Sequence, residues 1–300
     1  MNLLVTGAFG WTEKELNMLR ELGHEVVFMQ QEKEQLPCEA SWVEGIIGNG
    51  IFLFHSIEQF TSLKYIQLTS AGFDRVPMDY VKAKGIEIYN ARGVYSVPMA
   101  ELALCGVLEL YKQSRFFYEN QKAHKWEKHR GLSELYGKTV CIFGCGSVGS
   151  ECAKRFKAFG CSVIGVDIAP YQNELYDTML PIDASQDALR KADVVVLTLP
   201  LTNETRYLIN KERLSYMKEG AVLVNIARGA VVDTDALIEA LNTRLGGAVL
   251  DVFEEEPLCE DSLLWDMENV IITPHNSFVS DGNHKRMLDA IINNLKGTAT

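Results

Sequence analysis

The chain has 300 residues, of which 47% are hydrophobic, so it can bury a large core, and its length favours two domains over one. Its 29 Lys and Arg residues against 40 Asp and Glu residues give a formal charge of −11, which disfavours nucleic acids and anionic membranes as partners. The N-terminal stretch has no basic region, and its apolar run is too short for a signal peptide or a membrane span, so we expect a cytoplasmic protein.

The first third of the chain alternates short β-branched runs with amphipathic stretches, which is typical of a parallel sheet covered by helices. Residues 12–23 predict a helix that has Leu16, Leu19 and Leu22 on one face and stops at Gly23. We expect a small α/β unit here. Its predicted strands are residues 2–7, 25–29, 44–48, 64–68 and 86–90.

The middle of the chain begins with residues 99–111, which are apolar on nearly every side and predict a buried helix, either between domains or against another subunit. Residues 112–130 follow and are polar, basic and aromatic. One short basic cluster in an acidic chain is weak evidence for nucleic acid, so we expect a solvated or dimer-contacting arm.

A second α/β unit is predicted from residue 139 onward, and residues 283–297 predict a last helix that packs back on the first unit. The expected strands of this second unit are residues 139–143, 162–166, 193–199, 221–225, 247–252 and 269–273.

A glycine motif opens this second unit, where Gly144, Gly146 and Gly149 follow a strand and begin a helix. The N–H groups and dipole of such a helix N-terminus attract a pyrophosphate, which predicts dinucleotide binding. Asp167 ends the next strand, 18 residues beyond Gly149, where its carboxylate can accept hydrogen bonds from the ribose hydroxyls. A carboxylate repels a 2′-phosphate, so the expected cofactor is NAD; the alternative for Asp167 is a capping or turn residue.

The residues that directly follow each predicted strand are candidates for the site, because ligands of open parallel sheets bind outside the carboxyl ends of the strands. Alone, a histidine such as His275 is more often an ordinary solvated or core-edge residue. Here an arginine, a carboxylate and this histidine are expected to converge at the nicotinamide end of one crevice. The strand ends are Gly144, Asp167, Pro200, residues 225–228, Asp251 and His275.

Three further motifs, "NIARGAVVD" (225–233), "LDVFEEEP" (250–257) and "ITPH" (272–275), together with the glycine loop, resemble the D-isomer-specific 2-hydroxyacid dehydrogenase family. Residues 70–93 are also similar to the first domain of that family, so the resemblance extends over nearly the whole chain.

The resemblance implies an α/β fold with two Rossmann-like doubly wound domains and a cleft between them. Residues 1–95 would form a flavodoxin-like substrate domain and residues 96–275 the NAD-binding domain. Residues 276–300 would carry the C-terminal helix back to the substrate domain.

The resemblance also implies roles for individual residues. Arg228 would clamp the substrate carboxylate and carbonyl oxygen, Glu256 would be the partner of the histidine, and His275 would be the acid/base. The backbone N–H groups of Ser70, Ala71 and Gly72 would bind the substrate carboxylate. The expected cofactor-binding residues are Gly144, Gly146, Ser147, Val148, Gly149, Asp167, Pro200, Thr205, Ile226, Ala227, Arg228, Asp251 and His275.

Elementary chemistry supports the catalytic roles. Reduction of a 2-oxo acid turns the carbonyl oxygen into an alkoxide, so it needs a proton donor and a cation that orients the acid. Histidine titrates in the required range, a neighbouring carboxylate favours imidazolium, and a guanidinium grips a carboxylate in bidentate fashion. Together with the resemblance, this chemistry leads us to expect an NAD-dependent oxidoreductase that acts as a 2-oxo acid reductase. We also expect a homodimer through the NAD-binding domain and no metal.

Phosphoglycerate dehydrogenase is the nearest alternative. Members of that kind usually carry an Arg-Ser pair where this chain has Asn49 and Gly50, and this neutral pair favours an unphosphorylated acid such as glyoxylate or hydroxypyruvate. Lys64 and Arg75 are near enough in sequence to compensate. The motifs also allow an NAD-sensing, corepressor-like regulator, or another Rossmann enzyme such as an amino-acid dehydrogenase.

Some residues have competing interpretations. The seven cysteines are an odd number without a C-x-x-C pair and are interpreted as reduced core residues; a zinc site of Cys141, Cys145 and Cys152 is the alternative. Arg92, in a second Asn-Ala-Arg-Gly stretch, is interpreted as a hinge or loop residue. Phe278 departs from the small turn common in the family and is expected to reshape the pocket.

Overall fold

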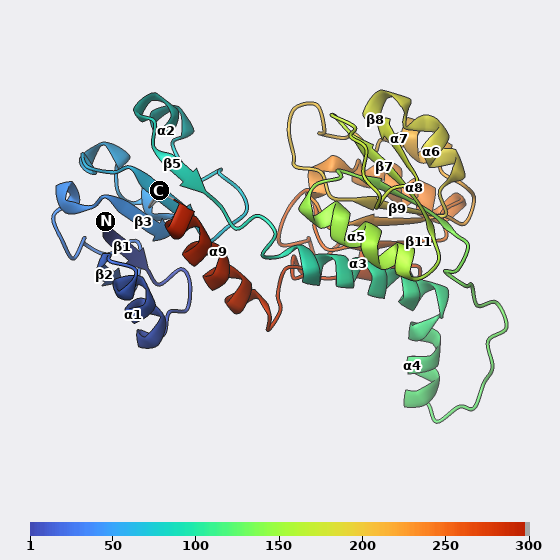
Figure 1. Cartoon of the computed structure of the whole chain (residues 1–300). Coiled ribbons are helices and arrows are strands. Elements are labelled where there is room, and N and C mark those ends of the chain that lie inside the picture. Colours follow the sequence, from blue (N-terminus) through green and yellow to red (C-terminus); the bar gives the residue numbers. More distant parts are fainter. Residues whose placement is uncertain (298–300) are drawn as a thin grey trace. The chain divides into compact units, whose positions relative to one another are not determined.

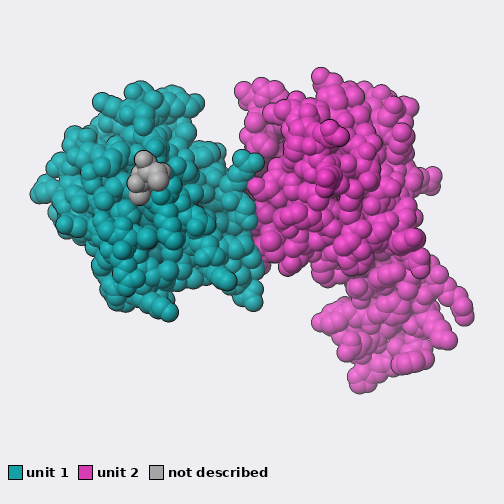
Figure 2. Space-filling model, viewed as in Figure 1, with its two compact units in different colours: residues 1–94, 280–300 teal, residues 95–279 magenta. Residues whose placement is uncertain are grey.

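The computed structural model describes residues 1–297 and divides the chain into two compact units. Unit 1 comprises Met1–Val94 together with the C-terminal segment from Ser280, and unit 2 comprises Tyr95–Val279, coloured teal and magenta in Figure 2. Residues 276–279, which were expected to belong with the C-terminal helix, are therefore part of unit 2.

Unit 1 contains a parallel five-stranded sheet in the order β2-β1-β3-β4-β5, which is the flavodoxin-like order expected for the first domain (Figure 1). All five predicted strands are confirmed. Their bounds are β1 Asn2–Thr6, β2 Glu25–Met29, β3 Gly45–Gly48, β4 Tyr65–Leu68 and β5 Glu87–Tyr89. The helices of the unit are α1 Glu13–Glu21, α2 Met78–Lys84 and α9 Asn283–Gly297.

Helix α1 begins with a capping box, in which the Thr12 side chain accepts from Glu15 N–H and the Glu15 carboxylate accepts from Thr12 N–H. Leu16 and Leu19 are buried as predicted. The prediction that Leu22 shares this face is wrong, because the helix ends at Glu21 and Leu22 is 36% exposed. The stop at Gly23 is confirmed by its φ of +86°.

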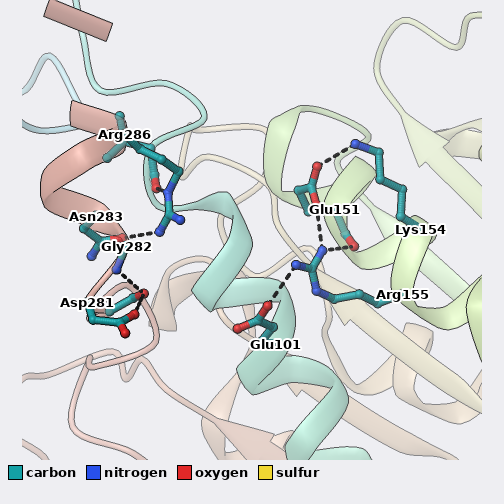
Figure 3. A network of polar contacts seen from close by, with 10 residues as sticks. Glu101, Glu151, Lys154, Arg155, Asp281, Gly282, Asn283 and Arg286 are labelled. Carbon is teal, nitrogen blue, oxygen red and sulfur yellow. Dashed lines mark hydrogen bonds and ion pairs between the residues drawn. The ribbon is translucent and has the colours of Figure 1, made fainter. Parts of the chain in front are cut away.

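Helix α9 completes unit 1, although it is remote in sequence from the rest of the unit. Its Asn294 amide donates to Gln67 Oε1 at 2.7 Å, and its Arg286 Nε donates to the Val94 carbonyl at 2.7 Å. Figure 3 shows Arg286 beside Asn283 near the start of this helix. The residues that α9 buries against the unit are Met287, Ile291 and Leu295.

Unit 2 contains a parallel seven-stranded sheet in the order β12-β11-β10-β9-β6-β7-β8. The strand order reverses between β6 and β9, which is the switch point of a doubly wound sheet and the usual place for a ligand. The six predicted strands are confirmed with small changes at their ends. The strands are β6 Thr139–Phe143, β7 Ser162–Asp167, β8 Thr178–Pro181, β9 Val194–Leu197, β10 Val222–Asn225, β11 Gly247–Leu250 and β12 Val270–Ile272.

Strand β8 was not predicted from the sequence. It has four residues, lies at the edge of the sheet, leaves both ends exposed and finishes at Pro181. A short edge strand is not buried on both faces and tolerates proline, so it lacks the continuous apolar run by which the other strands were found.

The helices of unit 2 cover its sheet, and α3 packs along α5 (Figure 1). Gly106 allows α3 to approach the sheet, because a Cβ atom there would lie 2.6 Å from Val249. An ion pair from Arg155 on α5 to Glu101 on α3, 3.0 Å long, joins the two helices (Figure 3). The helices are α3 Ser96–Tyr111, α4 Ser114–Lys122, α5 Ser147–Ala158, α6 Gln186–Lys191, α7 Lys211–Tyr216 and α8 Thr234–Thr243.

The cysteines decide the question of a zinc site. Cys141 belongs to the core on one face of the unit 2 sheet, whereas Cys145 and Cys152 belong to the core on the other face. Three ligands divided by a sheet cannot surround one ion, so the zinc interpretation is wrong. Within residues 1–297, no cluster of His, Cys, Asp and Glu side chains is arranged to hold a metal ion, and all seven cysteines are free thiols.

The predicted arm projects from the end of α3 as helix α4, followed by an irregular stretch (Figure 1). Several of its aromatic side chains are exposed, with Trp126 at 98% the most extreme. Across residues 1–297, no helix combines the length and the apolar character that a membrane span requires.

Candidate active site

The glycine loop after β6 contains two positions that require glycine and one that faces open space. Gly144 has a φ of +90°, and a Cβ atom at Gly149 would lie 2.1 Å from the Gly144 carbonyl oxygen, so both positions need glycine. A Cβ atom at Gly146 would instead meet nothing within 4 Å, which means that the loop faces open space there. Ser147 and Val148 form the first turn of α5, whose N-terminus opens at this loop.

The end of β7 carries Asp167. Its Oδ2 accepts from Cys145 N–H at 2.7 Å and its Oδ1 accepts from Ala169 N–H at 3.2 Å, so the carboxylate is held next to the glycine loop. The following residue, Ile168, is 77% exposed and offers no positive charge to a 2′-phosphate.

The end of β9 closes against the same loop through a residue that sequence reasoning missed. Thr198 donates its hydroxyl hydrogen to the Gly144 carbonyl at 2.6 Å. Two residues further on, the loop turns back on itself, because Thr205 Oγ1 donates to the Pro200 carbonyl at 2.7 Å. Thr205 is only 3% exposed, so its hydroxyl shapes this loop, and its contact with the adenosine stays a prediction.

The end of β10 presents Arg228. The Asn225 side chain accepts from Ala227 N–H and donates to the Arg228 carbonyl, both at 3.1 Å, and so fixes the turn. Ile226 and Ala227 are buried, while Arg228 is exposed. A Cβ atom at Gly229 would lie 1.8 Å from the Phe253 carbonyl carbon, so glycine lets this turn press against the stretch that carries Glu256.

Glu256 and His275 form the central pair of the site, with 2.7 Å between Glu256 Oε2 and His275 Nδ1. The other carboxylate oxygen accepts from Phe253 N–H at 3.0 Å. Burial opposes ionisation of Glu256, but the hydrogen bonds from His275 and Phe253 and the charges of His275 and Arg228 hold its pKa below the usual range. The structure therefore brings Arg228, Glu256 and His275 together, with His275 Nε2 as the ring nitrogen that this pair leaves for other chemistry.

The three glutamates of the acidic run 254–256 make different contacts in the structure. Glu254 accepts hydrogen bonds from Tyr207 and Thr234, at 2.7 Å and 2.6 Å, and so holds the loop in place. Glu255 is exposed. Among these three carboxylates only Glu256 pairs with His275.

Asp251 organises the turn that carries His275. Its fully buried carboxylate accepts from the Thr273 hydroxyl at 2.5 Å, from Asn276 N–H at 2.7 Å and from Ser277 N–H at 3.0 Å. These bonds hold His275 at a φ of +50°, a left-handed conformation that side-chain-bearing residues rarely adopt. The carboxylate of Asp251 thus accepts its hydrogen bonds from the protein itself. Its contact with the cofactor stays a prediction.

Phe278 lies against the histidine. The two rings meet edge to face, with 6.1 Å between the centroids of His275 and Phe278, and Tyr95 packs on Phe278 in the same manner at 5.9 Å. The departure from the small family turn thus places two aromatic rings beside His275.

In unit 1, Ser70, Ala71 and Gly72 form the turn after β4. Across residues 1–297, none of their three backbone N–H groups donates a hydrogen bond, which leaves them able to bind an anion. The turn is held from behind, because the Asn90 amide donates to the Ala71 carbonyl at 2.6 Å. Arg92 lies in the loop that precedes α3, as expected, and its side chain is exposed.

Lys64 does not serve as the compensating cation that the sequence allowed. It precedes β4, at the amino end of the strand, and pairs with Glu44 at 2.7 Å. Ligands bind at the opposite, carboxyl end of a parallel sheet, so this lysine lies on the wrong edge. Arg75 lies at the carboxyl end and is exposed.

Comparisons with known proteins agree with this geometry. A family model described as "D-isomer specific 2-hydroxyacid dehydrogenase, NAD binding domain" matches residues 104–277. The chain is 35% identical to a glyoxylate reductase from Pyrococcus horikoshii, over 79% of this chain and 74% of that protein. It is 38% identical to a D-3-phosphoglycerate dehydrogenase from Methanocaldococcus jannaschii, over 73% of this chain and 42% of that protein.

Among solved structures, a D-lactate dehydrogenase from Aquifex aeolicus, complexed with NAD and lactic acid, superposes with a TM-score of 0.76. That match has 27% identity and covers 99% of this chain and 95% of the other. The sequence motifs, both sheet orders and these likenesses lead to one conclusion: the chain belongs to the D-isomer-specific 2-hydroxyacid dehydrogenase family and is an NAD-dependent oxidoreductase.

Proposed function

We propose that the chain reduces small, unphosphorylated 2-oxo acids such as glyoxylate or hydroxypyruvate with NADH. The observation that carries this proposal is the pair of Glu256 and His275, 2.7 Å apart, with the Arg228 charge acting on it. Such a group can deliver a proton to an oxygen and hold a carboxylate, which are the two requirements of 2-oxo acid reduction.

In the proposed reaction, Arg228 holds the substrate carboxylate and orients the carbonyl group, and His275 Nε2 donates a proton to the carbonyl oxygen. Glu256 keeps the imidazole ring in the orientation that the 2.7 Å bond to Nδ1 sets. The dinucleotide would be held by the glycine loop and would supply the hydride. The amides of Ser70, Ala71 and Gly72 are further proposed ligands of the substrate carboxylate.

The proposed preference for NADH rests on Asp167 and Ile168. The carboxylate, held by Cys145 N–H at 2.7 Å, would accept the ribose hydroxyls and repel a 2′-phosphate. The exposed apolar residue that follows supplies no compensating cation.

The deciding experiment is NADH oxidation by the purified protein against glyoxylate, hydroxypyruvate, pyruvate, bulkier 2-oxo acids and 3-phosphohydroxypyruvate. We expect the highest kcat/KM with a short unphosphorylated acid. Binding of NADH without turnover of any acid would contradict the proposal and favour an NAD-sensing regulator.

A phosphoglycerate dehydrogenase activity is the second candidate, because the relative from Methanocaldococcus jannaschii has that name and Arg75 lies at the carboxyl edge of unit 1. A tenfold advantage of 3-phosphohydroxypyruvate over hydroxypyruvate, about 1.4 kcal/mol of transition-state binding, would identify it.

We further propose a homodimer that forms through unit 2, in the cytoplasm. The support for a dimer is the half-buried leucines of α3, among them Leu104 and Leu108, and the exposed Trp126 on the arm. Seven unpaired cysteines suit a reducing compartment. Light scattering of the purified protein tests the dimer, and a monomeric mass would contradict it.

A further inference from the structure

The turn after β3 in unit 1 forms an anion site that the protein fills with its own carboxylate. Glu32, in the loop after β2, accepts from Asn49 N–H with Oε1 and from Gly50 N–H with Oε2, both at 2.7 Å. The Thr6 hydroxyl, at the end of β1, donates to Oε1 at 2.8 Å. Two consecutive backbone N–H groups that converge on one anion are the usual arrangement of a backbone phosphate site.

The surrounding residues hold Glu32 in this position. A Cβ atom at Gly48 would lie 2.7 Å from Glu32 Oε1, so glycine leaves room for the carboxylate over the strand end. The ring Nε2 of His55 lies 2.9 Å from the Glu32 carbonyl and fixes its backbone. The adjacent Asn49 Oδ1 is buried and has no hydrogen-bond partner within residues 1–297, which marks this turn as incompletely satisfied.

The site adjoins the turn proposed to bind the substrate. Gly48 and Leu68 are register partners in β3 and β4, and Thr69 N–H donates to the Gly48 carbonyl at 2.9 Å. The Asn49 turn and the Ser70 turn are therefore neighbours on the carboxyl edge of one sheet, where ligands of parallel sheets bind. Glu32 is half-buried, so its charge remains accessible to a molecule bound there.

We propose that Glu32 is a specificity-determining residue that occupies the anion site of Asn49 and Gly50 and thereby rejects 2-oxo acids bearing a second anionic group. The inference rests on the proposed function and narrows it to acids with a short neutral tail. A phosphate or a second carboxylate would have to displace Glu32 from three charge-assisted hydrogen bonds or bind beside a like charge.

The test compares Glu32→Ala, which vacates the site, and Glu32→Gln, which keeps the shape without the charge, with Glu34→Ala. Glu34 is an exposed carboxylate in the same loop and makes the matched control. For each protein, kcat/KM is measured with 3-phosphohydroxypyruvate and with hydroxypyruvate, and circular dichroism checks folding. In Glu32→Ala we expect the ratio of the two values to rise about tenfold or more, with a smaller rise in Glu32→Gln.

If Glu32 has only a structural role, its variants will be less stable than the wild type but will keep the wild-type ratio of kcat/KM values. That outcome would overturn the inference. A rise of equal size in Glu34→Ala would also overturn it, because only the net charge would then matter. If Glu32→Ala does not fold, the ratio in Glu32→Gln decides.

A second readout separates this inference from the proposed function. Binding of inorganic phosphate is measured by calorimetry, without turnover, and we expect it to appear in Glu32→Ala and to be absent from the wild type and Glu34→Ala. If the wild type reduces no 2-oxo acid, the proposed function fails while phosphate binding still decides the role of Glu32. A wild type that prefers 3-phosphohydroxypyruvate would overturn the inference and leave the oxidoreductase assignment intact.

Discussion

Two turns of the molecule are built in the same way and serve different ends. In unit 2, Asp251 accepts from the N–H groups of Asn276 and Ser277 and from a threonine hydroxyl. In unit 1, Glu32 accepts from the N–H groups of Asn49 and Gly50 and again from a threonine hydroxyl. Both turns follow a parallel strand at its carboxyl end.

The difference between the turns is burial. Asp251 is fully buried, and its hydrogen bonds fix the backbone that carries His275. Glu32 is half-buried, so the same hydrogen bonds leave its charge within reach of a bound molecule. A carboxylate on consecutive backbone N–H groups is therefore a scaffold where solvent is excluded and a competitor for ligands where it is not.

The largest loss of activity is expected when His275, which the turn around Asp251 carries, is replaced. His275→Gln should lower kcat for 2-oxo acid reduction by about two to four orders of magnitude, the usual worth of a general acid, with NADH affinity little changed. Steady-state kinetics and NADH titration measure both quantities. Near-native turnover would show that the turn does not present the proton donor.

The next largest effect is expected on stability, when the carboxylate of Asp251 or of Glu32 is replaced by an amide. Asp251→Asn should lower the free energy of unfolding by about 2–4 kcal/mol, because an amide NH₂ would face a buried backbone N–H group. Glu32→Gln should cost about 1 kcal/mol, since water can reach its turn. Urea denaturation of both variants gives the two values, and equal losses would remove the distinction that burial makes.

Glu256 extends the comparison to a partly exposed carboxylate that is paired with a side chain. Glu256→Gln should reduce kcat about tenfold or more, because the imidazole loses the hydrogen-bonded carboxylate that fixes its orientation. Steady-state kinetics measures the change. Glu255→Gln, a change of the exposed neighbour, is the control and should behave as the wild type.

The pH dependence of the same variant tests the lowered pKa of Glu256. A carboxylate whose folded pKa lies below its unfolded value of about 4.5 contributes stability above that pH and loses it as the pH falls through the folded pKa. The stability difference between wild type and Glu256→Gln should therefore be full at pH 7 and shrink below about pH 4.5. A difference that does not change with pH would mean that the pair contributes no charge interaction.

Asp167 should give the weakest change and is a third carboxylate that accepts backbone N–H groups at a strand end. The wild type should have a higher kcat/KM with NADH than with NADPH, and Asp167→Ala should narrow that preference about tenfold. The KM for the 2-oxo acid should not move. Equal use of both cofactors by the wild type would show that Asp167 acts only as a scaffold, like Asp251.

Both α/β units, without strand β8, and the glycine loop could be predicted from the order of residues, whereas the grouping of Arg228, Glu256 and His275 came from the resemblance to a family. Strands and helices follow from the spacing of apolar residues, and the glycine motif can be recognised from its position between a strand and a helix. Parallel strands place their carboxyl ends on one edge, so the order of motifs along the chain already predicts which side chains meet.

The role of each carboxylate, in contrast, depends on how the chain packs. Glu32 lies 17 residues before Asn49, and Asp251 lies 25 residues before Asn276, so neither spacing indicates which turn will fold beside it. The edge strand β8 was not predicted because its end residues are exposed. Leu22 does not lie on the predicted buried face because helix α1 ends at Glu21. Burial and the approach of distant turns are properties of the packed chain, and they set the strength and accessibility of every charge in the site.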